Sequence, residues 1–99
     1  MIELKSDLID QYLKINNNIL AVFGSSQCKH CIDLKPQLYK LSSEYPEREI
    51  IFIDCDKFPI SADLYYIENY PTIIHFIQQQ PIDTIITNNI NKIKSLWNL

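Results

Sequence analysis

The sequence lacks any apolar segment long enough to span a membrane, because its hydrophobic runs are only a few residues long. It also lacks the apolar core of a signal peptide, since the charges of Glu3, Lys5 and Asp7 interrupt the first residues. Nor is there an excess of basic charge: 9 Lys and Arg against 12 Asp and Glu give a net charge of -3. We therefore expect a cytoplasmic protein that binds neither a membrane nor nucleic acid.

Glycine is almost absent, whereas isoleucine is abundant: the chain has one glycine and 18 isoleucines. Isoleucine, asparagine and lysine have AT-rich codons, so the composition is typical of an AT-rich genome, such as that of a large DNA virus or a parasite. The hydrophobic fraction of 46% and the charged fraction of 21% are those of a globular protein. A chain of 99 residues suffices for one core, so residues 1–99 are interpreted as a single domain, and we expect a monomer.

Hydrophobic patterning predicts an alternation of strands and helices. Ser6 is the expected cap of the first helix, and Asn88 or Asn89 that of the last. The expected strands are Ile2–Leu4, Ile19–Phe23, Ile50–Ile53, Thr72–Ile77 and Ile82–Thr87, with a turn at Gln78–Pro81 before the last one. The expected helices are Ser6–Ile15, Cys28–Tyr45, Pro59–Ile67 and a last helix that contains Ile90, Ile93, Leu96 and Trp97. The order β-α-β-α-β-α-β-β-α indicates an α/β fold with a mixed sheet.

Three cysteines, Cys28, Cys31 and Cys55, are odd in number and argue against a framework of structural disulfides. Cys28 and Cys31 form a Cys-x-x-Cys pair, which is typical of thiol–disulfide chemistry or of half a zinc site. The pair begins a long helix, whose free N–H groups and partial positive charge stabilise an anion. Cys28 is therefore the expected thiolate nucleophile, with Cys31 one turn further on and near enough to close a disulfide.

A metal site is the main alternative on spacing alone. A zinc ion needs two further ligands, and the only candidates are Cys55, His75 and His30. None of them forms a second closely spaced pair. We therefore expect no metal and no other cofactor, and we keep a metal or iron–sulfur site at Cys28 and Cys31 as the least favoured alternative.

These motifs together resemble the thioredoxin family over nearly the whole chain. The matching pieces, in order, are Ile19–Phe23, Cys28-Lys29-His30-Cys31, Pro36, Ile53-Asp54-Cys55-Asp56 and Tyr70-Pro71-Thr72. The resemblance implies a thioredoxin fold, with a central mixed β-sheet flanked by helices. It also implies that Pro71 is cis and faces the disulfide, and that the backbone of Tyr70 pairs with a substrate peptide.

The function that the resemblance implies is that of a protein-disulfide oxidoreductase, an electron-transport protein with a redox-active disulfide. Cys28 attacks, and Cys31 resolves the mixed disulfide. His30 precedes the second cysteine as in the disulfide isomerases, so we expect it to stabilise the Cys28 thiolate and to make the protein more oxidising than ordinary thioredoxin. The expected substrate groove consists of Gln27, Lys29, Tyr70, Pro71 and Thr72. Protein dithiols and disulfides are the expected partners, together with an electron donor or acceptor protein that the sequence does not identify.

Several positions depart from the family pattern. Gln27 and Gly24 replace two tryptophans of the family's groove. Val22 and Phe52 stand where the family carries a buried carboxylate and a lysine paired with it, so the group that moves the proton of Cys31 is missing. A second class of function therefore stays open: a non-catalytic thioredoxin-fold module that docks a partner or senses its redox state.

Cys55 and His75 have mainly structural interpretations. We expect Cys55 to be a small buried residue at a strand end, with a third redox thiol as the alternative. We expect His75, in the middle of an apolar strand, to be a structural histidine with a satisfied hydrogen bond.

Overall fold

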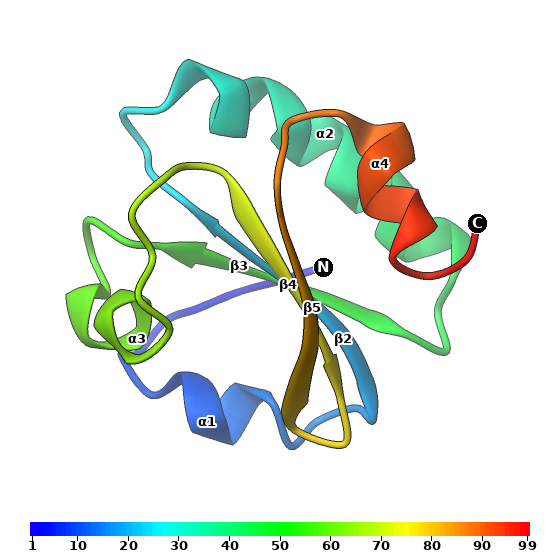
Figure 1. Ribbon diagram of the computed structural model, residues 1–99, viewed down its shortest axis with the longest axis horizontal. Helices are drawn as coiled ribbons and strands as arrows, with labels where there is room; N and C mark the ends of the chain where they lie inside the picture. Colours follow the sequence, from blue (N-terminus) through cyan, green and yellow to red (C-terminus); the bar gives the residue numbers. More distant parts are fainter.

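The computed structural model describes residues 1–99 as a five-stranded mixed sheet with helices on both faces (Figure 1). The strands are β1 (Ile2–Glu3), β2 (Asn18–Gly24), β3 (Glu49–Asp54), β4 (Thr72–Ile77) and β5 (Gln80–Ile86). The helices are α1 (Ile9–Tyr12), α2 (Lys29–Glu44), α3 (Pro59–Leu64) and α4 (Ile90–Ser95). This order confirms the β-α-β-α-β-α-β-β-α succession that the sequence predicts.

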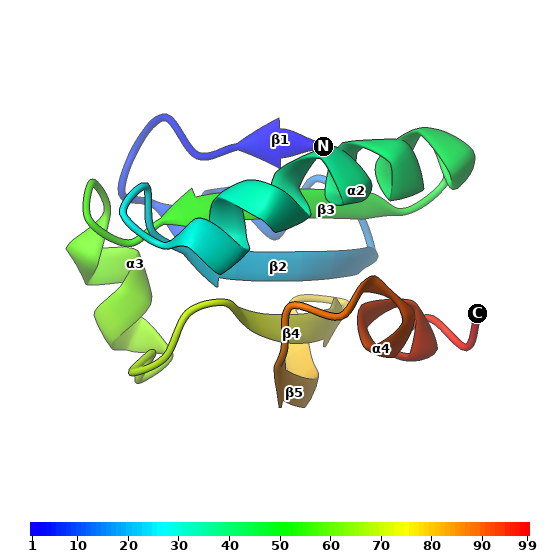
Figure 2. The same cartoon turned by 90° about the horizontal axis from the view of Figure 1, so that it is seen from above.

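The strands lie in the order β1-β3-β2-β4-β5, which Figure 2 shows side by side. Strands β1, β3 and β2 are parallel, whereas β4 runs antiparallel to β2, and β5 antiparallel to β4. The central strand β2 is buried from Ile19 to Gly24, as expected of a continuous apolar run that is covered on both faces. Because β2 and β3 are parallel, their last residues, Gly24 and Asp54, are register partners at the carboxyl ends of these two strands.

Two hydrophobic clusters separate the two faces of the sheet. Helices α2 and α4 cover one face, and α1 and α3 cover the other (Figure 1). Successive strand residues point to opposite faces, so Val22 packs in the cluster under α2 and Phe23 in the cluster under α1. None of the four helices is both long and apolar enough to cross a membrane.

Helix α2 follows the predicted range of Cys28–Tyr45, whose two end residues are its caps. The buried stripe of this helix consists of Cys31, Leu34, Leu38 and Leu41, and it packs on the sheet beside α4. Burial of each leucine contributes about 2 kcal/mol of hydrophobic free energy. This packing fixes the beginning of α2, and with it the cysteine pair, against the ends of β2 and β3.

The prediction that Ser6 caps the first helix is wrong. Helix α1 begins only at Ile9, after Leu8 as its N-cap, and no side chain caps it. The residue after Ser6 has another partner: the Asp7 carboxylate accepts the N–H groups of Ile60 at 2.9 Å and Ser61 at 2.7 Å. Asp7 therefore satisfies free N–H groups in the first turn of α3. This contact ties residue 7 to α3, and α1 begins only after it.

The C-terminal elements agree with the sequence except at β5 and at the end of α4, which stops at Ser95, so that Leu96 is its C-cap and Trp97 lies beyond the helix. Asn89 is the N-cap of α4, and its side chain accepts the N–H of Asn91 at 2.9 Å. Strand β5 begins at Gln80 rather than at Ile82, because the turn before it needs only Gln78 and Gln79, both at positive φ. Pro81 thus lies inside a strand, where it is tolerated because β5 is at the edge of the sheet.

Candidate active site

The two cysteines of the Cys-x-x-Cys pair lie together where α2 begins. The thiol of Cys31 donates to the sulfur of Cys28, and 2.6 Å separate the two Sγ atoms. The Cys28 sulfur also accepts the backbone N–H of Cys31 at 3.3 Å, so Cys28 is the N-cap of the helix. Cys28 is half-buried, whereas Cys31 is fully buried. The geometry therefore offers one accessible sulfur with a second sulfur directly behind it.

Cys31 holds its proton firmly. Burial raises the pKa of the Cys31 thiol to about 12, and the hydrogen bond and charge of Cys28 act in the same direction. At neutral pH the thiol of Cys31 is therefore protonated, and any step in which its sulfur acts as a nucleophile must first remove that proton.

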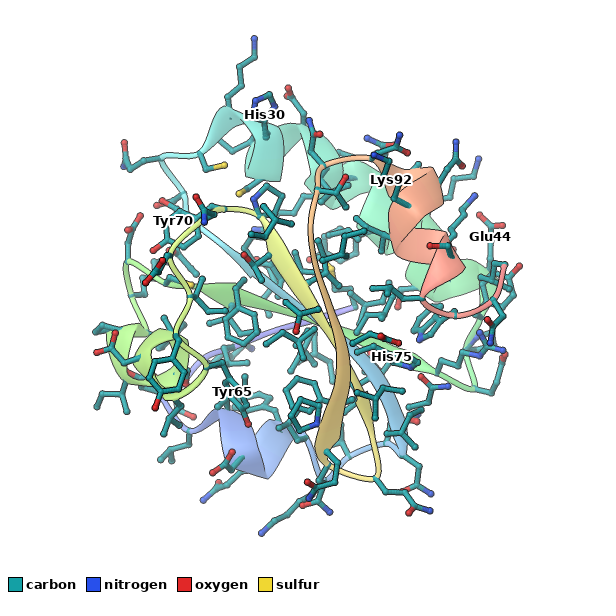
Figure 3. All side chains as sticks on the ribbon, in the orientation of Figure 1. His30, Glu44, Tyr65, Tyr70, His75 and Lys92 are labelled. Atoms are coloured by element: carbon teal, nitrogen blue, oxygen red, sulfur yellow. The ribbon has the colours of Figure 1, made fainter.

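The loop before β4 brings Tyr70 and Pro71 to the cysteine pair. The Tyr70–Pro71 peptide bond is cis, which confirms the expectation for Pro71. The carbonyl oxygen of Tyr70 lies 3.9 Å from Cys28 Sγ. Thr72 is buried behind them, and its hydroxyl donates to the carbonyl of Asn69 at 2.7 Å. Figure 3 shows the Tyr70 side chain and His30 at the same end of the molecule, the end at which α2 begins.

Ser25 and Asp56 brace the loop between β2 and α2. The hydroxyl of Ser25 donates to the carboxylate of Asp56 and accepts the backbone N–H of Gln27 at 3.0 Å. Gln27 and Lys29 are exposed on either side of Cys28 in the chain. A serine hydroxyl that accepts the N–H two residues further on forms a side-chain turn, and local sequence can indicate such a turn. The contact with Asp56 is not local, because Asp56 follows β3.

The ring of His30 is held by a residue far along the chain. The amide nitrogen of Asn88 donates to His30 Nδ1 at 3.0 Å, an arrangement that places the proton of a neutral ring on Nε2. Asn88 lies in the loop between β5 and α4, beside the helix cap Asn89. From the sequence, Asn88 is expected only as a helix cap, because nothing in local spacing indicates a contact between residues 58 positions apart.

The wall under Cys31 is apolar and tightly fitted. Val22 and Phe52, the positions of the family's buried carboxylate and lysine, are register partners and are 0% and 4% exposed. A Cβ atom on Gly24 would lie 2.7 Å from Cζ of Phe52 and 3.1 Å from Sγ of Cys31. Glycine fits at position 24 without strain, whereas any side chain there would have to displace Phe52 or Cys31.

A cavity of about 190 Å³ lies beside Cys31. Its lining includes Cys31, Phe52, Lys35 and Asp54, with Ser25, Ser26 and Ile32 around them. The ammonium group of Lys35 lies 4.6 Å from the centre of the Phe52 ring and forms an ion pair with Glu3. The hydrogen bond from Lys35, with a second from Tyr39, lowers the pKa of Glu3. The cavity thus places the ionisable side chains of Lys35 and Asp54 next to the buried thiol of Cys31, whereas the strand residues under that thiol, Val22 and Phe52, do not ionise.

Cys55 and His75 do not join the cysteine pair. Cys55 follows β3 as a 5% exposed residue, and burial, reinforced by the charge of Asp54, raises the pKa of its thiol to about 12. His75 donates from Nε2 to Asn18 Oδ1 at 2.8 Å, whereas its Nδ1 has no partner. Figure 3 shows His75 well away from His30 and Tyr70. No group of three or more His, Cys, Asp or Glu side chains is placed to hold a metal ion.

The sheet order, the helices on its two faces and the cysteine pair at the start of α2 define the thioredoxin fold. A thioredoxin from Fasciola hepatica has the same fold, with a TM-score of 0.90 and 21% identity over 97% of this chain and 95% of its own. The thioredoxin family model matches residues 1–98, and the chain belongs to the thioredoxin family of thiol–disulfide oxidoreductases.

Two curated relatives are similar in sequence. A protein disulfide-isomerase of Humicola insolens is 29% identical over 75 residues, which are 74% of this chain and 15% of that protein. A thioredoxin-like protein of Synechocystis is 32% identical over 65 residues, which are 65% of this chain and 62% of that protein. The chain thus spans less than two thirds of the length of each.

Proposed function

We propose that this protein is a cytoplasmic, monomeric thiol–disulfide oxidoreductase that exchanges disulfides with protein substrates through Cys28 and Cys31. The observation that carries the proposal is the pair of sulfurs 2.6 Å apart at the beginning of α2, one accessible and one buried. Two unlike thiols in contact are what a two-step exchange requires: one to meet the substrate and one to release it. The chemistry needs no cofactor.

The exchange runs through a mixed disulfide. The Cys28 sulfur attacks one sulfur of the substrate disulfide, and the other substrate sulfur leaves as a thiolate. Cys31 then attacks the Cys28 sulfur, and the second substrate sulfur leaves. Two electrons pass from the Cys28–Cys31 dithiol to the substrate, and the reverse sequence oxidises a substrate dithiol. A partner protein that donates or accepts electrons returns the pair to its starting state.

The substrate groove that we propose lies around Cys28 and consists of Gln27, Lys29, Tyr70, Pro71 and Thr72. The closeness of the Tyr70 carbonyl to Cys28, 3.9 Å from its sulfur, supports this groove. A substrate strand laid beside Tyr70 would gain backbone hydrogen bonds there while its own sulfur meets Cys28.

We further propose that the pair is more oxidising than ordinary thioredoxin. His30 in the first turn of α2 stabilises the reduced pair by charge or hydrogen bond, and stabilising the thiolate makes a disulfide more oxidising. The apolar Val22 acts in the same direction, because a carboxylate there would oppose the thiolate. The reduction potential of thioredoxin is about -270 mV and that of protein disulfide isomerase about -180 mV, so we expect a reduction potential on the order of -230 to -190 mV for this protein.

The test is reduction of insulin disulfides with dithiothreitol as the electron source. We expect the wild type to accelerate the reaction and Cys28→Ser to abolish the acceleration. Cys31→Ser should trap substrates as mixed disulfides through Cys28, because the resolving thiol is missing. Cys55→Ser, which changes a thiol outside the pair, is the control and should retain activity. If the wild type does not accelerate the reduction and the Cys31→Ser variant traps no substrate, the protein is instead a docking or sensing module.

A further inference from the structure

We propose that Asp54 takes the proton that leaves Cys31, through water in the cavity that the two side chains share. The inference rests on the proposed function, since only the resolving step of a disulfide exchange requires Cys31 to lose its proton. It assigns a role to a residue for which the sequence offered only a position at a strand end.

The need for such a group follows from the surroundings of Cys31. Its side chain is fully buried, and the strand residues beneath it, Val22 and Phe52, carry no group that titrates. A proton cannot leave a buried thiol without an acceptor within reach, directly or through water. The acceptor must therefore lie along the cavity, which is the one polar opening beside Cys31.

The register of the sheet brings Asp54 to that opening. Asp54 is the partner of Gly24 across β2 and β3 and lies two residues after Phe52, so its side chain is on the face of the sheet that α2 covers. Gly24 has no side chain, and a Cβ atom there would lie 2.7 Å from Cζ of Phe52 and 3.1 Å from Cys31 Sγ, so these two side chains fill the space above it. The route between Cys31 and Asp54 therefore runs through the cavity that both side chains line.

The cavity has room for water and a polar lining. Its volume of about 190 Å³ exceeds the ~15 Å³ that a single water molecule needs. The exposed residues Ser26 and Ile32 form part of its lining, so it communicates with solvent. Water in the cavity can hydrogen-bond to the Asp54 carboxylate and to the hydroxyl of Ser25.

Asp54 is the side chain in the cavity that can accept a proton. One carboxylate oxygen, Oδ1, accepts the backbone N–H of Asp56 at 3.0 Å, and Oδ2 has no partner in the protein. Lys35 also lines the cavity, but its ammonium group is already protonated and paired with Glu3. The other ionisable groups around Asp54 and Cys31 are Cys28 at the start of α2, Cys55 and Asp56 after β3, and Tyr70 before β4.

The step balances in atoms and electrons. In the mixed disulfide, the Cys28 sulfur is bonded to a substrate sulfur, and Cys31 still carries its proton. The proton passes through water to Asp54 Oδ2 as the Cys31 sulfur bonds to the Cys28 sulfur. The bond between Cys28 and the substrate breaks, and its electron pair leaves with the substrate thiolate, which takes a proton from solvent. Asp54 then returns its proton to solvent through the cavity.

Asp54→Asn separates this role from a structural one, because the amide oxygen can still accept the Asp56 N–H but cannot take a proton. An aromatic disulfide such as dithiobis(nitrobenzoate) releases one coloured thiolate when Cys28 attacks and a second when Cys31 resolves. We expect Asp54→Asn to leave the first phase unchanged and to slow the second about tenfold at pH 7. The difference should shrink as the pH rises, because hydroxide then removes the proton. Asp54→Glu should restore most of the rate.

The matched control is Asp33→Asn, which removes the same charge from an exposed position on α2 and should leave both phases unchanged. Equal second phases in Asp54→Asn and the wild type across the pH range would overturn the proposal. So would a slowing of both phases together, or one that does not depend on pH, since either indicates a structural role. Failure of the proposed function is a different result: a wild type that releases only one thiolate and does not reduce insulin.

Discussion

The cysteine pair has two sides that differ in chemistry. The outer side, formed by Cys28, His30, Tyr70 and Pro71, is polar and partly exposed. The inner side, formed by Gly24, Val22 and Phe52 around Cys31, is buried and apolar where the family carries a charged pair and a tryptophan. In the exchange that we propose, the attack on a substrate takes place on the outer side. The resolving step needs the inner side, and there the chain requires another solution.

The inner side changes as a unit. A single charge left at Val22 or Phe52 would be buried without a partner and would cost several kcal/mol, so both positions become apolar together. The ring of Phe52 occupies the space above position 24, so glycine fits there without strain. Gly24, Val22 and Phe52 therefore pack as one fitted set under Cys31.

The largest contrast between the two sides should appear in the reactivity of the thiols. Burial raises the pKa of Cys31 and of Cys55 to about 12, so at pH 7 only about one thiol in 10⁵ is a thiolate. We expect iodoacetamide to label Cys28 of the reduced protein at least a hundredfold faster than the other two cysteines. Their thiolate fraction, and with it their labelling rate, should rise tenfold for each pH unit below that pKa.

Mass spectrometry of tryptic peptides after timed labelling measures all three rates in one experiment. Unfolding in denaturant is the control, because it should bring the three cysteines to similar rates. Faster labelling of Cys31 than of Cys28 in the native protein would reverse the roles that we propose for the two thiols.

The tightness of the inner side gives the next effect. Gly24→Ala places a Cβ atom 2.7 Å from Cζ of Phe52, so we expect it to lower the free energy of unfolding by about 2 kcal/mol, the usual result of overpacking. In a Phe52→Leu background, the smaller side chain should make the same substitution less destabilising. Urea unfolding of the four proteins yields the coupling energy of the pair. Additive effects would show that Phe52 is not what excludes a side chain at position 24.

The sequence predicts the outer side better than the inner one, for physical reasons. Hydrophobic periodicity acts locally, so it identifies α2 from Cys28 onward and the succession of strands and helices along the chain. The cis bond at Pro71 is expected from the family resemblance of Tyr70-Pro71-Thr72, and the structure confirms it. The features that the sequence did not predict involve residues far apart in the chain. Asp7 caps α3, whereas Ser6 does not cap α1, and the Asn88 side chain contacts His30. The cavity that Cys31 and Asp54 share is lined by residues of α2, of β3 and of the loop before α2, and no local pattern reports it.

The smallest effect that we expect concerns His30, on the outer side. If its imidazole stabilises the reduced pair, His30→Pro should lower the reduction potential by about 30 mV, which corresponds to about 1.4 kcal/mol for two electrons. Asn88→Ala should shift it less and in the same direction, because the ring loses the hydrogen bond to Nδ1 that orients it. Equilibration with glutathione buffers, followed by thiol trapping, measures each potential. A wild-type potential at or below that of thioredoxin, unchanged in His30→Pro, would show that His30 does not contribute to the reduction potential, which Cys28, Cys31 and their apolar inner side would then set alone.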